Sequence, residues 1–431
     1  HTGTVTLSWH PHLWHPTTQV ATSPEPWKVV RAQGCQLELQ DGRRLIDAIS
    51  SWWVTLHGHG EPAIAAAIGR QALQLEQVIF ANFSHDPAEQ LATRLAALTG
   101  LERLFFSDNG STAVEVALKI AWQWWRNQGS DRRQLIAFEG AYHGDTFGAM
   151  AVGDRSVFTV PYDELLFDVA RIPWPHTHWG DQSVEVREAQ ALLELERALE
   201  TPSAAVILEP LIQGASGMHV VRPGFLRAVQ ERVRASGALL IADEVMTGFG
   251  RTGALFACQR AGLQPDLMAL SKGLTGGFLP MGVTMASERL YQGFISSTPE
   301  HTFFHGHSFT ANPLGCAAAL ASLDLLQHNP ERYQQFEALH MPRLEQLAQV
   351  PRVERVRCLG TMAALELNLG AAGYLNPVGK QIQQLCLQQG VFLRPLGHVI
   401  YLLPPLCIRE AQLQQCYDAI AAAIDHLTAN H

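Results

Sequence analysis

Short, wholly apolar runs recur through the middle of the chain, and longer stretches with helical periodicity separate them. The clearest runs lie at residues 103–106, 135–138, 205–208, 239–242 and 267–270. Such runs are typical of strands that are buried on both faces, and strands that alternate with helices favour parallel pairing. The pattern therefore predicts an α/β fold built on a large, mostly parallel sheet.

The two ends of the chain differ from this central pattern. Residues 1–55 are rich in Trp, Pro and His, and short strands are expected around the turn at residues 41–44. An Ala- and Leu-rich helix is expected at 315–327, and helices and strands follow to about residue 430. A chain of this length favours two domains. We expect a large domain at 56–315 and a smaller α+β domain formed by 1–55 and 316–431.

Composition excludes several classes of protein. The 431-residue chain is 47% hydrophobic and carries a formal net charge of −9, which indicates a globular protein. The negative charge argues against nucleic acid or an anionic membrane as the partner, because both are bound through basic patches. No apolar run is long enough to span a membrane, and the first residues lack the pattern of a signal peptide.

Cysteine and histidine spacing gives no sign of a metal. The seven cysteines show no CxxC spacing, which disfavours a disulfide framework or zinc ribbon and favours a reducing cytoplasm. The nineteen histidines include four close pairs, but no pair is joined by a cysteine or carboxylate cluster of recognised spacing. We therefore expect no metal site. The pairs are His10 and His12, His57 and His59, His176 and His178, and His305 and His307.

Asp243 and Lys272 each follow one of the apolar runs. In an open α/β sheet the carboxyl ends of the strands line the ligand crevice, so both side chains are expected there. An amine and a carboxylate at neighbouring strand ends suit pyridoxal phosphate (PLP). The amine forms the Schiff base, and the carboxylate pairs with the protonated pyridine nitrogen. Taken singly, Lys272 could be a surface lysine and Asp243 a helix cap, but together they predict a PLP site.

A candidate phosphate site lies at residues 107–112, which follow a predicted strand and open a helix. Gly110 lets a ligand approach the backbone, and Ser111 lies in the first turn, whose free N–H groups attract anions. The alternative is an ordinary turn from strand to helix. Thr112 and Glu115 have the spacing of a capping box.

The loop at residues 139–145 follows another predicted strand. Tyr142 is the candidate platform on which a flat heterocycle could stack. Asp145 and His143 could orient the ring or the substrate, although His143 could equally be a hydrogen-bonded loop residue. Glu209 also ends a strand, and three roles stay open for it. It could cap a helix, bond to a cofactor group or take part in catalysis.

Trp52 and Trp53 are adjacent, so they cannot both face the same way along a strand. One is expected in the core, while the other lines a pocket.

Residues 243–253, together with Ser271, Lys272 and Gly273, resemble the signature of the class III aminotransferases. The resemblance runs from about residue 12 to about residue 425. It implies the type I fold of PLP enzymes, with PLP as cofactor and with Lys272, Asp243 and Tyr142 as catalytic residues.

Narrower features are similar to the branch of this family that converts 8-amino-7-oxononanoate to 7,8-diaminononanoate in biotin biosynthesis. This resemblance implies that Trp52, Trp53 and Asp145 bind substrate. The features lie at residues 13–16, 41–47, 50–53, 144–150, 394–397 and 400–405.

Two positions set the chain apart from family members that act on ornithine or 4-aminobutyrate. Those members pair a Glu in a Gln-Gly-Glu-Ala-Gly motif with a substrate-binding Arg, whereas this chain has Ala215 and Tyr401 there. Arg394 is the nearest cation, and a guanidinium suits the carboxylate at the far end of the keto substrate. We therefore expect Arg394 and Tyr401 to line the substrate site.

The chain departs from the well-known members that use S-adenosylmethionine at the substrate mouth. Thr17 replaces a Tyr, and His307 and Ser308 replace a Pro-Thr pair. In this family the hydroxyl at the Ser308 position contacts the phosphate of the neighbouring subunit, which implies a homodimer. The amino donor is expected to be S-adenosylmethionine, with lysine as the alternative.

Two other classes of PLP protein fit the sequence less well. A PLP aminomutase shares the fold, but Arg394 and the Trp52–Trp53 pair argue against it. A PLP-binding transcription regulator would need an appended basic helix-turn-helix.

Overall fold

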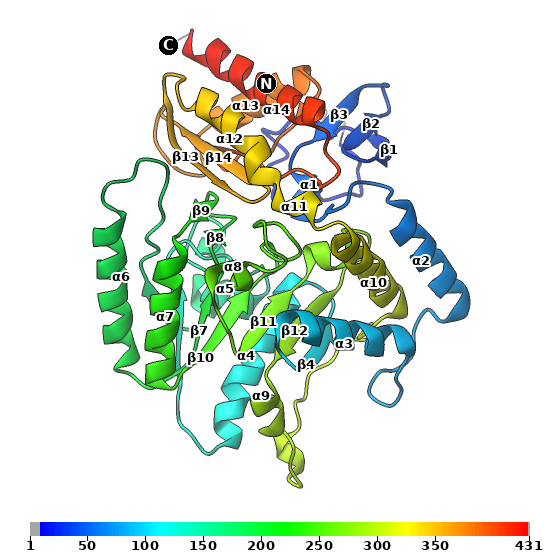
Figure 1. Ribbon diagram of the computed structural model, residues 1–431, viewed down its shortest axis with the longest axis vertical. Helices are drawn as coiled ribbons and strands as arrows, with labels where there is room; N and C mark the ends of the chain where they lie inside the picture. Colours follow the sequence, from blue (N-terminus) through cyan, green and yellow to red (C-terminus); the bar gives the residue numbers. More distant parts are fainter. Residues whose placement is uncertain (1–8, 430–431) are drawn as a thin grey trace, which may run out of the picture.

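The computed structural model describes residues 9–429, and a seven-stranded sheet forms its centre (Figure 1). Every neighbouring pair is parallel except those of β12, which runs antiparallel to both β11 and β4. The predicted mostly parallel sheet is confirmed. In spatial order the strands are β4 (Arg103–Ser107), β12 (Gly282–Ala286), β11 (Leu267–Leu270), β10 (Leu239–Asp243), β7 (Ser203–Leu208), β5 (Gln134–Phe138) and β6 (Ala170–Ile172).

Helices cover both faces of this sheet, which explains why its strands are apolar throughout. Leu239 and Ile241 pack on the face covered by α4, whereas Leu240 and Ala242 pack on the opposite face with α7. The α4 face carries α4 (Gly110–Asn127), α5 (Phe147–Val152) and α9 (Glu288–Gln292). The other face carries α3 (Asp86–Thr99), α6 (Val184–Leu199), α7 (Pro223–Ser236), α8 (Ala257–Ala261) and α10 (Pro313–His328).

Both ends of the chain contribute to one smaller sheet, which lies above the large sheet in Figure 1. β15 from the C-terminal part pairs in parallel with β3 from the N-terminal part. The sheet contains β1 (Val29–Gln33), β2 (Gln36–Leu39), β3 (Arg44–Asp47) and β15 (Val391–Phe392). A second antiparallel sheet contains β13 (Val353–Leu359), β14 (Met362–Leu367) and β16 (Val399–Leu402), and a ribbon contains β8 (Ile212–Gln213) and β9 (His219–Val220).

The remaining helices pack near these smaller sheets or link them to the large one. They are α1 (Ser50–Trp53), α2 (Pro62–Gln74), α11 (Glu331–Gln334), α12 (Phe336–Leu347), α13 (Val378–Gln388) and α14 (Glu410–Thr428). Residues 9–429 also contain three short 3-10 helices: η1 (Val160–Leu165), η2 (Lys272–Thr275) and η3 (Pro299–His301). Helix α10 continues across the expected boundary at residue 315, and the division into two domains stays a prediction.

Across the described part of the chain, no helix combines the length and the apolar character needed to cross a membrane.

Candidate active site

Lys272 and Asp243 lie together at the carboxyl edge of the large sheet. Asp243 is the last residue of β10, and Lys272 begins η2 just beyond β11. The two strands are parallel neighbours, with Asp243 beside Ala269 in register. Both side chains line one cavity of about 540 Å³. The two strand-end residues singled out from the sequence therefore share one site.

The amine of Lys272 lies within this cavity without a hydrogen-bond or ion-pair partner among residues 9–429, and its Nζ is 5.1 Å from the ring centroid of Trp53. Burial lowers the pKa of Lys272, and the carboxylates of Asp243 and Glu209 act in the opposite direction. Its φ of 44° is uncommon for a residue with a side chain. A lysine with a lowered pKa is suited to act as a nucleophile or proton carrier.

His143 holds the Asp243 carboxylate in place. His143 Nδ1 lies 2.6 Å from Asp243 Oδ2, and the backbone N–H of Val245 donates to Oδ1 at 3.0 Å. Burial acts to lower the pKa of His143, but the hydrogen bond and charge of Asp243 outweigh it, so the pKa is raised. The imidazole and the Val245 N–H together fix the direction of the carboxylate, which is a group that can pair with a protonated heterocycle.

Glu209 is a second buried carboxyl group in the same cavity. It accepts hydrogen bonds from the backbone N–H groups of Tyr142 at 3.0 Å and Gly214 at 3.2 Å. Burial raises the pKa of Glu209 to about 7, while the charge of His143 acts to lower it. Glu209 can therefore carry a proton near neutral pH, which a simple helix cap does not require.

Helix α4 begins where the sequence predicted a phosphate site. Asn109 is its N-cap: Asn109 Oδ1 accepts from the Thr112 N–H at 2.9 Å, and Thr112 Oγ1 accepts from the Asn109 N–H at 3.1 Å. The capping box predicted for Thr112 and Glu115 is wrong, because the helix begins before Thr112. Gly110 is required at the first helical position, since a Cβ there would lie 2.6 Å from Val245 Cγ1.

Glu115 instead joins α4 to the start of α5. Glu115 Oε1 accepts from Thr146 Oγ1 at 2.6 Å and from the Ala149 N–H at 2.8 Å. Ser111 Oγ lies 2.7 Å from Thr146 Oγ1, so both hydroxyls lie beside the N-terminus of α4. Helix N-termini bind anions, and Gly110, Ser111 and Thr146 all line the cavity. These three residues could hold a phosphate group.

The loop after β5 supplies one wall of the cavity, with Tyr142, His143 and Asp145. The Tyr142 side chain is partly exposed, which leaves its ring available for stacking. Burial of the hydroxyl, together with the charge of Asp145, raises the pKa of Tyr142, so the phenol stays protonated. The three residues expected at this loop therefore lie together.

A second cavity of about 700 Å³ opens from the first and shares Trp53, Tyr142 and Lys272 with it. At its far side, Arg394 Nη2 donates to Thr17 Oγ1 at 3.1 Å. The guanidinium carbon of Arg394 also lies 5.3 Å from the ring centroid of Trp52. The two cavities together connect Lys272 with Arg394.

Trp52 and Trp53 lie in the short kinked helix α1, so the strand assumed for them is wrong. Ser51 and Trp53 have positive φ, and this kink separates the directions of the two indoles. Trp53 is buried and its Nε1 donates to the Tyr401 hydroxyl at 2.9 Å, whereas Trp52 is exposed at the cavity. Tyr401 itself is buried in β16, also at the cavity.

Ser308 and His307 lie outside both cavities in this chain. Ser308 is exposed, and its carbonyl accepts from Gln77 Nε2 at 3.0 Å. His307 Nε2 lies 2.9 Å from His305 Nε2. Their expected contact with the phosphate and the substrate mouth of a neighbouring subunit stays a prediction.

Sequence reasoning missed Thr146, Phe158 and Tyr374 among the cavity residues. Thr146 follows Asp145 directly at the start of α5, so its position beside the predicted site was a usable signal. Nothing in the sequence predicts the contact between Phe158 and Tyr374.

Comparison with known proteins identifies the family. Residues 17–424 match the model of the family described as "Aminotransferase class-III". A relative from Synechococcus elongatus is 57% identical over 97% of this chain and 99% of its own length. A relative from Geobacter sulfurreducens is 40% identical over 97% of this chain and 96% of its own. The chain belongs to the class-III aminotransferases. Both relatives are named adenosylmethionine-8-amino-7-oxononanoate aminotransferase.

Solved structures of class-III aminotransferases and their relatives share the fold. An adenosylmethionine-8-amino-7-oxononanoate aminotransferase from Methanocaldococcus jannaschii superposes with a TM-score of 0.88 at 32% identity, covering 95% of this chain and 97% of the other. A PLP-bound amine transaminase from an uncultivated Pseudomonas species gives 0.90 at 29%, covering 97% and 99%. The predictions of a class-III transaminase, the type I fold and a PLP cofactor are confirmed.

The site of this aminotransferase fits PLP. It offers the Lys272 amine, which has no hydrogen-bond or ion-pair partner among the described residues, and the Asp243 carboxylate, which His143 orients. Gly110, Ser111 and Thr146 line the cavity at the N-terminus of α4 and form its anion site, and Gly110 lets α4 begin in close contact with Val245. Amine, carboxylate and anion site are the groups needed by an aldehyde, a pyridine nitrogen and a phosphate.

Proposed function

We propose that this aminotransferase transfers an amino group to 8-amino-7-oxononanoate and forms 7,8-diaminononanoate in biotin biosynthesis. The observation that carries the proposal is the position of Arg394, which lies in the cavity that also contains Lys272. An acceptor with a ketone near one end and a carboxylate at the other matches this arrangement. The name printed for the Synechococcus relative supports the same acceptor.

The guanidinium of Arg394 is already oriented before any substrate binds. Thr17 accepts one of its N–H groups, and the ring of Trp52 lies beside it. Tyr401 lies deeper, where the indole N–H of Trp53 fixes its hydroxyl. Arg394 is thus free to use its remaining N–H groups on a carboxylate.

Bound PLP supplies an electron sink that makes the donor α-carbon acidic. Lys272 Nζ takes the proton from that carbon in the first half of the reaction, and returns one to the acceptor carbon in the second. Its lowered pKa favours the neutral amine that can accept the proton. Asp243 would pair with the pyridine nitrogen of bound PLP, while His143 orients the Asp243 carboxylate.

We propose S-adenosylmethionine as the amino donor. The names of the relatives support it, and the ring of Trp53 provides an apolar surface next to Lys272. Thr17 in place of a Tyr is the feature that keeps lysine as the alternative donor.

We also propose a C2 homodimer in the cytoplasm. Ser308 lies on an exposed segment away from its own cavity, which suits a contact made to a neighbouring subunit. All seven cysteines are free thiols, which suits a reducing compartment.

The acceptor can be tested separately from the donor. The enzyme is loaded with pyridoxamine phosphate and mixed with one acceptor at a time, and return of the visible absorption of the PLP form is followed. We expect 8-amino-7-oxononanoate to restore it fastest. If pyruvate or 2-oxoglutarate restores it while 8-amino-7-oxononanoate is inert, the proposed acceptor is wrong.

A further inference from the structure

Two aromatic side chains meet at the second cavity. The ring centroids of Phe158 and Tyr374 are 4.8 Å apart, with an edge-to-face angle of 72°. Phe158 lies in the loop after α5, and Tyr374 lies in the loop between β14 and α13. Both rings line the cavity that contains Arg394, and both keep a substantial exposed surface. The pair therefore bridges two separate loops at the cavity wall.

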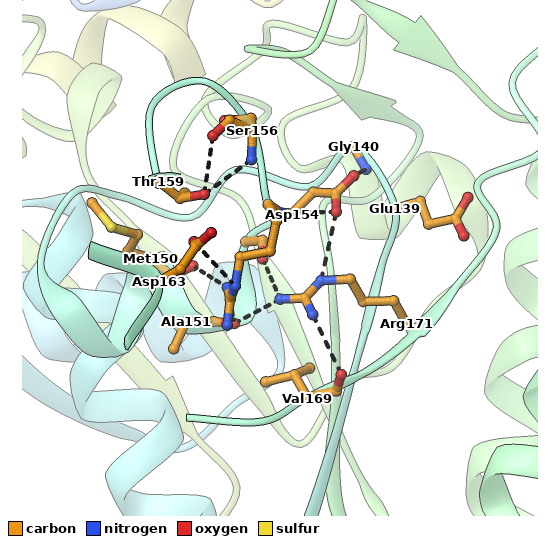
Figure 2. Close-up of polar contacts among 12 residues, drawn as sticks. Glu139, Gly140, Met150, Ala151, Asp154, Ser156, Thr159, Asp163, Val169 and Arg171 are labelled. Atoms are coloured by element: carbon orange, nitrogen blue, oxygen red, sulfur yellow. Dashed lines mark hydrogen bonds and ion pairs between the residues drawn. The ribbon is translucent and has the colours of Figure 1, made fainter. Parts of the chain in front are cut away.

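The Phe158 loop is fixed by ionic contacts on its outer side. Arg155 forms an ion pair with Asp163 at 3.7 Å, and Arg171 lies 3.6 Å from Asp154 (Figure 2). The other carboxylate oxygen of Asp154 accepts from the Gly140 N–H at 2.6 Å. These contacts tie the loop to β6 and to the segment after β5.

A small turn at the tip of the same loop sets the position of the ring. The Ser156 N–H donates to Thr159 Oγ1 at 3.0 Å, and Thr159 Oγ1 donates to the Ser156 carbonyl at 3.1 Å (Figure 2). Phe158 lies within this turn. The turn therefore fixes the backbone at Phe158, and the contact with Tyr374 positions its ring.

The Tyr374 loop is fixed against the segment that carries Arg394. The Gly373 N–H donates to His398 Nδ1 at 3.0 Å, and Gly397 packs so closely on the Gly373 carbonyl that no side chain could be added there. Tyr374 is thus placed relative to Arg394 by a short, tight connection.

The wall between Lys272 and Arg394 is largely apolar, with Met150, Leu396 and Val399 among its residues. A ligand that reaches both ends must lay its hydrocarbon chain along this wall. Burial of each methylene strengthens binding about fourfold.

We propose that Phe158 and Tyr374 form an aromatic rim that covers the aliphatic chain of the acceptor and makes these two residues determinants of chain-length specificity. The proposal rests on the proposed function only for the identity of that acceptor. Any ligand with a carboxylate on Arg394 and an unbranched chain should contact the same rim.

The test uses straight-chain saturated monocarboxylates, from butanoate to nonanoate, as ligands of the holoenzyme, with calorimetry as the readout. We expect wild-type affinity to rise about fourfold per methylene over the lengths that reach the rim. Phe158→Ala and Tyr374→Ala should flatten this increment to about twofold or less. Arg394→Ala should instead weaken the whole series by a constant factor. Tyr374→Phe should keep the wild-type increment.

Tyr162→Ala is the matched control, because Tyr162 is an exposed aromatic on η1 that contacts Phe147 and lies outside the cavity. The gain in affinity per methylene should be the same in this variant as in the wild type. If either alanine variant fails to fold, Phe158→Leu provides the measurement, with an increment between those of wild type and alanine.

An unchanged increment in the rim variants would overturn the proposal, and would leave the rim as packing between two loops. The carboxylate series does not depend on turnover. The role proposed for the rim can therefore be wrong while 8-amino-7-oxononanoate is still the acceptor. It can equally be correct if the acceptor proves to be another compound. In steady state, the rim variants should raise KM for the acceptor about tenfold and leave kcat and the donor KM nearly unchanged.

Discussion

The imidazole Nδ1 of His143 lies 2.6 Å from Oδ2 of Asp243, and both side chains are buried. The remaining ring nitrogen of His143 has no hydrogen-bond partner in residues 9–429. The carboxylate is therefore the principal polar partner of this histidine. The pair behaves as one unit, in which His143 fixes the orientation of the Asp243 carboxylate.

Asp243→Asn keeps the size of the side chain but removes its charge. We expect kcat to fall by about 100-fold or more while the unfolding temperature changes little, because the electron sink depends on a protonated pyridine nitrogen. His143→Asn removes the hydrogen bond to Asp243 together with the buried ring, and should lower kcat about 10- to 150-fold. Steady-state kinetics and thermal unfolding measure both.

The matched control is Asp324→Asn, which breaks an exposed ion pair with Arg94 and should leave kcat unchanged. Near-normal turnover of the Asp243→Asn variant would remove Asp243 from the mechanism.

Gly110→Ala should weaken PLP binding by about tenfold or more, because the added Cβ would lie 2.6 Å from Val245 Cγ1 and push apart the start of α4 and the segment after β10. The dissociation constant of the cofactor, measured by fluorescence titration, is the readout. Gly69→Ala in α2 is the control, since its Cβ meets open space and a helical alanine is favoured. Unchanged cofactor affinity in the Gly110 variant would argue against a phosphate at this helix.

Arg394→Ala should raise KM for the keto substrate about 10- to 150-fold, the value of one charged hydrogen bond, and should affect the donor half-reaction much less. Thr17→Val removes one contact that orients the guanidinium, together with the hydrogen bond from Thr17 Oγ1 to the Pro16 carbonyl, and leaves Arg394 in place, so a smaller increase is expected. The two half-reactions are measured separately by stopped-flow absorbance. An equal loss in both would mean that Arg394 does not distinguish acceptor from donor.

Glu209 should make stability depend on pH. Burial raises its pKa from an ordinary value of 4.5 to about 7, so the folded protein binds this proton more tightly than the unfolded chain. Its contribution is fully present below about pH 4.5 and is lost as the pH rises through 7. The lost free energy of unfolding is on the order of 3 kcal/mol.

Glu209→Gln should remove this part of the pH dependence. Denaturant unfolding of the cofactor-free protein between pH 4.5 and 8 provides the comparison. If the difference in unfolding free energy between wild type and variant stays constant over that interval, Glu209 does not carry the proton.

The sequence was informative wherever a residue's position follows from strand order alone. Asp243 ends β10 and Lys272 lies just beyond the parallel neighbour β11, so the apolar runs before them were enough to place both at one edge of the sheet. The sequence analysis did not predict strand β12, whose run Gly282–Ala286 contains a Gly and a Thr and is less apolar than its neighbours, and its antiparallel pairing has no local signal.

Contacts between distant loops could not be predicted. The partnership of His143 with Asp243 depends on the loop after β5 reaching across β7 to β10. Phe158 and Tyr374 meet because two separate loops are fixed in place. Ion pairs position the loop of Phe158, and close packing of two glycines positions the loop of Tyr374. Neither relation leaves a periodic or local signal in the chain.

The most direct measurement is the amount of 7,8-diaminononanoate formed, by mass spectrometry, when the holoenzyme receives 8-amino-7-oxononanoate together with one amino donor. We predict rapid formation with S-adenosylmethionine, and none of that product from the Lys272→Ala variant. Formation with lysine alone would correct the donor and leave the acceptor in place. Absence of the product with every donor, from an enzyme that transaminates ornithine or 4-aminobutyrate, would contradict the account.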